Sequence, residues 1–102
     1  MTPHPKPNRP KRDRAHMAKV ATLPCVICGY WPVQVHHCIS GRYSQRRAPD
    51  TETIPLCWRH HDAQSPEGLH HAPAAWARRH GPDVSFLKRV SEQINEMEGN
   101  TV

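Results

Sequence analysis

Four side chains that bind zinc well occur in two pairs, each with two residues between its members. Cys25 and Cys28 form a C-x-x-C sequence followed by Gly29, and Cys57 and His60 repeat the spacing with an imidazole in the last place. A closed Cys3His set of this kind is typical of structural zinc. The alternative, a redox pair at Cys25 and Cys28, normally lies in a thioredoxin-like βαβ context, which this sequence lacks. We therefore predict a structural zinc ion that contributes directly to folding.

The other histidines form a second group that could do chemistry. They are the adjacent pair His36 and His37, then His61 beside the predicted zinc ligand His60, then His70 and His71. Adjacent residues of a strand point to opposite faces, so one histidine of the first pair can hold a metal while the other faces a substrate. An open, imidazole-rich site tolerates magnesium, manganese or zinc.

The elements that must position these residues are short. Alternation of apolar and polar residues predicts a strand over 33–37, and an apolar segment at 54–56 predicts a brief return strand. Proline at the start of a run and Gly-Pro at its end predict a helix over 73–80. We also expect helices over 14–22 and within 58–64.

A final helix should follow Asp83, which we expect to cap it. Its apolar residues recur at helical spacing and predict one stripe that faces the core, without a role in an active site. The residues of that stripe are Phe86, Leu87, Val90, Ile94 and Met97. Cys38 has no metal-binding partner in this scheme, and we expect it to be a small buried residue beside the strand.

The composition allows one small domain with a thin core. The chain has 102 residues, of which 36% are hydrophobic and 6% aromatic, and it contains 11 prolines. Small domains of this kind usually need a metal, a disulfide or a partner. We find neither a membrane-spanning apolar run nor a signal peptide, and we expect a cytoplasmic protein with no membrane association.

Basic residues favour a polyanionic partner such as DNA, because the formal net charge is +5. Residues 1–14 are rich in Pro, Lys and Arg, and predict a disordered basic arm before a domain over 15–102. The arm either keeps the chain soluble or lies along DNA phosphates. The loop over 40–53 is the densest basic patch outside the arm, and we favour DNA contacts there over a merely solvated loop. Its candidate contact residues are Arg42, Tyr43, Arg46 and Arg47.

Taken together, these motifs resemble the HNH (ββα-metal) endonuclease superfamily. The order is C-x-x-C-G, then V-Q-V-H-H-C-I-S-G-R-Y-S-Q, then I-P-L-C-W-R-H-H, then L-H and a short helix that ends in H-G. More narrowly, the chain is similar to the phage recombination-enhancement (Ref-like) nucleases, which act on DNA together with the RecA-type recombinase filament of the host. The resemblance runs from about Cys25 to Pro82.

The resemblance implies an α+β fold, a small zinc-stapled ββα-metal domain with flanking helices, in the bacterial host cytoplasm if the protein is phage-encoded. It also implies that His37 is the general base of a DNA endonuclease. The implied ligands of the catalytic cation are His36, His61 and His70, although the sequence does not separate His70 from His71. The asparagine found in the middle of many HNH motifs has no evident match here, and Asp50 is the nearest candidate.

Two other readings stay open at this point. The chain could be a zinc-stapled DNA-binding module, which needs only one metal ion and leaves the histidine pairs as surface residues. It could also be an adaptor whose N-terminal arm and last helix dock on a recombination protein, and this reading is compatible with either of the others.

Overall fold

A short antiparallel hairpin forms the centre of the protein. The structure, a computed structural model, describes residues 12–40 and 48–99. Strands β1 (Gln34–His37) and β2 (Thr53–Leu56) pair so that His36 lies opposite Ile54. The helices are α1 (Arg14–Val20), α2 (Trp58–His61), α3 (Pro73–His80), the 3-10 helix η1 (Asp83–Phe86) and α4 (Leu87–Met97). The predicted small α+β domain with a two-stranded hairpin is confirmed.

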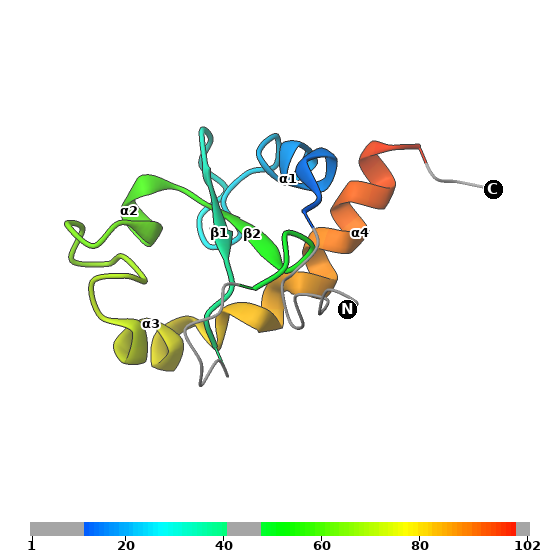
Figure 1. The fold of residues 1–102 in the computed structure, drawn as a ribbon. Coiled ribbons are helices and arrows are strands. Elements are labelled where there is room, and N and C mark those ends of the chain that lie inside the picture. Colours follow the sequence, from blue (N-terminus) through cyan, green and yellow to red (C-terminus); the bar gives the residue numbers. More distant parts are fainter. Residues whose placement is uncertain (1–11, 41–47, 100–102) are drawn as a thin grey trace, which may run out of the picture.

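The helices lie at two sides of the hairpin. Helices α1 and α4 contact each other and both contact β2, whereas α2 contacts both strands and continues toward α3 on the far side (Figure 1). Cys57, which directly precedes α2, therefore lies beside the hairpin. None of the described helices has the length and apolar character needed to cross a membrane.

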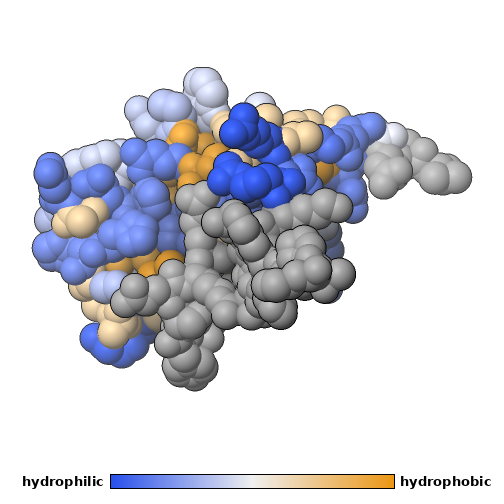
Figure 2. All heavy atoms as spheres, in the orientation of Figure 1, coloured by the Kyte–Doolittle hydropathy of each residue, from blue (hydrophilic) through white to orange (hydrophobic). Residues whose placement is uncertain are grey.

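The core is small and is centred on β2. All four residues of this strand are buried, and Ile54 and Leu56 are fully enclosed. Val20 of α1 and Val90 of α4 pack into the same cluster, which also contains Cys38 as expected. Hydrophilic residues cover most of the described surface in the view of Figure 2, and hydrophobic residues appear as smaller patches among them.

The final helix differs from the expectation in two respects. Asp83 does not cap it: α4 begins after Phe86, and the Asp83 carboxylate instead accepts hydrogen bonds from the backbone of Ile39 and Ser40. Ile39 and Ser40 lie more than 40 positions before Asp83 in the sequence, and their backbone N–H groups bind its carboxylate in place of N–H groups at the start of α4. Met97 is also not in the core, because α4 extends past the other elements and leaves this side chain 47% exposed.

Helix α2 is a single turn at the start of the predicted 58–64 segment. It ends at His61 because Asp62 leaves the helical conformation, and the Asp62 side chain accepts a hydrogen bond from the backbone of Gln64. An aspartate that bonds two residues ahead favours a turn over helix continuation.

Several predictions fall partly or wholly outside the described residues. Residues 1–11 of the basic arm are among them, as are all four predicted DNA contacts, Arg42, Tyr43, Arg46 and Arg47. Within the described part, the Asp13 side chain caps α1 by accepting from the backbone of His16, and Arg12 forms an ion pair with Asp50. Arg12 and Asp13 therefore contact the folded domain.

We expect Ile54→Ala to lower the free energy of unfolding by about 2–5 kcal/mol, because it deletes a fully buried side chain and leaves a cavity. Ile39→Ala, the same substitution at a residue that is 39% exposed, should lower it by less than about 1 kcal/mol. Denaturant unfolding of the zinc-saturated proteins measures both. Equal losses at the two positions would contradict a core centred on β2.

Candidate metal centres

The first candidate ligand pair lies on a tight turn just before the hairpin. The backbone N–H of Gly29 donates to the carbonyl of Cys25 at 2.8 Å, and the N–H of Cys25 donates to the carbonyl of Tyr30 at 2.9 Å. Gly29 adopts φ 78°, a left-handed conformation that glycine tolerates without strain. The turn folds the chain so that the sulfurs of Cys25 and Cys28 come close together.

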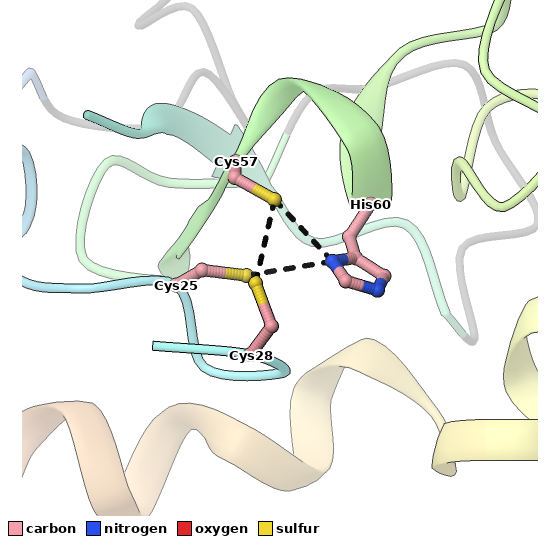
Figure 3. Close-up of side chains that lie close together, drawn as sticks. All are labelled: Cys25, Cys28, Cys57 and His60. Carbon is pink, nitrogen blue, oxygen red and sulfur yellow. Dashed lines mark hydrogen bonds between the residues drawn. The ribbon is translucent and has the colours of Figure 1, made fainter. Parts of the chain in front are cut away.

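The second ligand pair, Cys57 and His60, faces this turn from the first turn of α2. Figure 3 shows the four side chains directed toward one another. The Cys28 and Cys57 sulfurs are 3.7 Å apart, and His60 Nδ1 lies 3.3 Å from Cys57 Sγ and 3.9 Å from Cys25 Sγ. Tetrahedral zinc with ordinary bond lengths requires about 3.8 Å between sulfurs and about 3.5 Å between sulfur and nitrogen. The residues therefore fit a structural zinc ion.

The protonation of this group also fits a cation. Burial raises the pKa of the Cys57 thiol to about 11, whereas hydrogen bonds from neighbouring backbone groups outweigh burial at Cys25 and lower its pKa. Burial also lowers the pKa of His60, which keeps its imidazole neutral and able to donate a lone pair. Since zinc binds thiolate and neutral imidazole, metal binding must displace the Cys57 proton, and affinity should increase with pH.

A second group consists of His36, His61 and His70. Their candidate ligand atoms all lie within 4.8 Å of one another. The return from His61 to His70, with eight residues between them, is fixed by backbone hydrogen bonds from Leu69 to the His60 carbonyl and from His70 to the His61 carbonyl. Gly68 makes the return possible, because a Cβ at this position would lie 1.9 Å from the Asp62 carbonyl oxygen.

The free ring nitrogens of His36 and His61 converge on one point. The buried Asp83 carboxylate lies 2.8 Å from His36 Nε2, and the side-chain oxygen of Gln34 accepts from His61 Nδ1. Since carboxylate and amide oxygens only accept, both of those nitrogens carry protons. The remaining nitrogens, His36 Nδ1 and His61 Nε2, are 3.1 Å apart. Two lone pairs at this distance need a proton or a metal ion between them.

Electrostatics at this group favour neutral ligands. Burial, followed by the neighbouring His36 and His70, lowers the pKa of His61 to about 4, and burial also lowers the pKa of His70. Burial alone would raise the pKa of Asp83, but its hydrogen bonds from His36, Ser40 and Ile39 outweigh burial and lower it well below its ordinary range. An ionised carboxylate behind a metal-binding histidine orients the ring and increases its basicity.

His37, the predicted general base, is not part of the three-histidine group. Its Nε2 lies 2.9 Å from Asp50 Oδ1, while the other Asp50 oxygen accepts from the backbone N–H of Asp13 at 2.8 Å. The Asp13 N–H, His37 and Arg12 together lower the pKa of Asp50. His71 is also outside the group, because its Nδ1 bonds to the Ala63 carbonyl, so the structure separates His70 from His71.

Two carboxylates and an amide have positions that the sequence did not indicate. Asp83 had been expected to cap α4, Gln34 had no predicted role, and Asp50 was only the nearest match to a missing asparagine. Each now contacts a histidine ring directly. Of the three, Gln34 was the easiest to predict from the sequence, because it lies two residues before His36 on the same strand and therefore on the same face.

The fold and the ligand geometry define a small α+β domain with a Cys3His group that fits structural zinc. The chain belongs to the DUF968 family, described as proteins of unknown function, whose family model matches residues 2–96. No curated protein and no solved structure matches the chain. The family model thus matches nearly the whole chain, and because its description gives no activity, the activity has to be inferred from the site.

Removal of zinc should unfold the domain. We expect Cys57→Ser to abolish stoichiometric zinc binding and the cooperative thermal transition, because classical sites with this ligand set contribute folding energy outright. Cys38→Ser is the matched control: it replaces a buried cysteine outside the ligand group and should retain the zinc ion. Metal analysis together with circular dichroism gives both readouts. A folded, zinc-free Cys57→Ser protein would contradict the structural role.

The three-histidine group should hold a second, exchangeable metal ion. We expect His70→Ala to eliminate it, and His71→Ala to leave it in place, because only His70 belongs to the group. Asp83→Asn should weaken metal binding about 10- to 100-fold through loss of the charge behind His36. Titration with manganese or cobalt into zinc-loaded protein measures these affinities. Identical titrations for the His70 and His71 variants would exclude this assignment.

Proposed function

We propose that the protein is a metal-dependent DNA endonuclease of the HNH (ββα-metal) type, which hydrolyses phosphodiester bonds. The observation that carries the proposal is the convergence of three imidazoles on one point, separate from the Cys3His group. Three protein ligands leave a coordination position open, as in catalytic rather than structural metal sites. A zinc-stapled DNA-binding module has no need of this second group.

His37 is the proposed general base. The ionised Asp50 accepts the Nε2 proton of His37, so Nδ1 is left with its lone pair. That nitrogen can remove a proton from a water molecule, and a neutral imidazole suits this task near neutral pH. Asp50 holds the ring in one tautomer and stabilises the imidazolium that forms, a role that a carboxylate fulfils beside a histidine base in other hydrolases.

The placement of His36 and His37 suits in-line attack on a phosphodiester. They are adjacent on β1 and have different partners, Asp83 for His36 and Asp50 for His37. The attacking water and the leaving oxygen lie on opposite sides of the phosphorus, so the base and the cation-binding residues must approach it from different directions. A cation held by His36, His61 and His70 would stabilise negative charge on the phosphate and the leaving oxygen.

DNA is the proposed substrate on grounds of charge and resemblance. The net charge of +5 favours a polyanion, and Arg42, Tyr43, Arg46 and Arg47 stay our candidates for its contacts. The similarity to phage recombination-enhancement nucleases supports action in phage DNA recombination with a recombinase filament. The catalytic cation in this proposal is magnesium, manganese or zinc, because imidazole ligands with an open position accept all three.

His37→Ala should reduce DNA cleavage by about 10²- to 10⁴-fold, the usual contribution of a general base. The assay is nicking of plasmid and single-stranded DNA with added magnesium or manganese, with and without a recombinase filament. Asp50→Asn should also reduce the rate, because an amide does not stabilise the imidazolium. His71→Ala, a histidine outside both groups, should cleave like the unaltered protein.

Zinc content decides how a loss of activity is interpreted. A His37→Ala protein that keeps its structural zinc and has lost cleavage supports a chemical role for the ring. Metal-dependent nicking that survives in this variant would overturn the proposed mechanism. Absence of cleavage by the unaltered protein under every condition, filament included, would favour a DNA-binding module.

A further inference from the structure

Two large aromatic side chains surround a hollow beside the Cys3His group. Tyr30 is 61% exposed and Trp58 is 52% exposed, although side chains of this size are usually well covered. They line a hollow of about 360 Å³ together with Arg59 and the zinc-ligand candidates Cys28 and Cys57. The hollow is thus lined by two aromatic residues, an arginine and two cysteines.

Arg59 lines this hollow and has a guanidinium group that is held in one orientation. Its guanidinium group donates two hydrogen bonds to the Glu67 carboxylate, at 2.7 and 3.0 Å, which orients the plane without burying it. Aromatic rings and guanidinium planes are the groups on which unpaired nucleic-acid bases stack. Stacking tolerates any base, because every base has a π face.

The hollow lies next to the candidate catalytic group. Trp58 and His61 are three residues apart on α2, and side chains at this spacing lie on the same face with Cβ atoms about 5–6 Å apart. A base stacked on Trp58 would therefore bring its own backbone close to His61. This continuity, and the positive charge of the chain, favour a nucleic acid over an apolar protein surface as the occupant.

We propose that the hollow formed by Tyr30, Trp58 and Arg59 binds an unstacked base of single-stranded DNA next to the three-histidine group. The inference rests on the proposed function for the choice of DNA, and it adds a preference for single strands or unpaired ends. Bases within a duplex already stack on their neighbours and do not reach such a hollow. Sequence preference should be weak.

The test compares binding of a single-stranded oligodeoxythymidine with an abasic oligonucleotide of equal length. Fluorescence anisotropy is measured on the full chain loaded with one zinc ion per molecule, without further divalent cation, so that the three-histidine group carries no metal and no cleavage occurs. Trp58→Ala should raise the Kd for oligodeoxythymidine about 5- to 150-fold, the range expected for loss of one stacked base. The abasic strand should bind the variant and the unaltered protein equally.

Two further variants control for shape and for general surface effects. Trp58→Phe keeps an aromatic face and should retain most of the affinity. Trp31→Ala removes a neighbouring tryptophan that is 60% exposed but does not line the hollow, and it should leave binding unchanged. Equal affinity of the unaltered protein for the two strands would overturn the proposal without any variant, and would favour a protein partner at this surface.

The outcome is separable from that of the nuclease assay. Discrimination between the two strands that depends on Trp58, without cleavage under any condition, would support the base site and reject the endonuclease. Cleavage that depends on His37, without discrimination between the two strands, would support the endonuclease and reject the base site.

Discussion

The rest of this structure depends on the meeting of two distant chain segments at the Cys3His group, whose geometry fits a structural zinc ion. A core centred on one four-residue strand supplies little packing energy, and the pairs Cys25–Cys28 and Cys57–His60 close the fold where packing is thin. The carbonyl of His60 also accepts from the backbone of Leu69 and from the indole N–H of Trp76. One residue thus joins the zinc-binding turn, the return loop and α3.

The geometry of the second histidine group depends on where the Cys3His group places α2. His61 follows His60 directly, and the loop that returns to His70 is tied to the carbonyls of both residues. His36 reaches the same point from β1, with its ring held by Asp83 at the start of η1. The three-histidine group is therefore assembled from three segments, and its precision depends on hydrogen bonds behind the histidines rather than on a large core.

The sequence alone predicts those elements that depend on residues close together in the chain. The C-x-x-C and C-x-x-H pairs, the strand alternation before His37 and the proline at the start of α3 are local signals, and the corresponding elements occur within one or two residues of the predicted bounds. Long-range carboxylates were not predictable. In the sequence, Asp83 looks like a helix cap. Nothing near it in the sequence reveals that its partners are His36 and the backbone after β1. The choice between His70 and His71 likewise depended on the path of a loop.

The adjacency of His60 and His61 has a thermodynamic consequence for assembly. Each belongs to a different metal-ligand group, yet one peptide bond joins them and one short helix contains both. Metal bound at the first group would stabilise the conformation that the second group needs, so the two affinities would be linked and each ion would strengthen retention of the other. The availability of zinc would therefore influence the fraction of molecules able to bind the second cation.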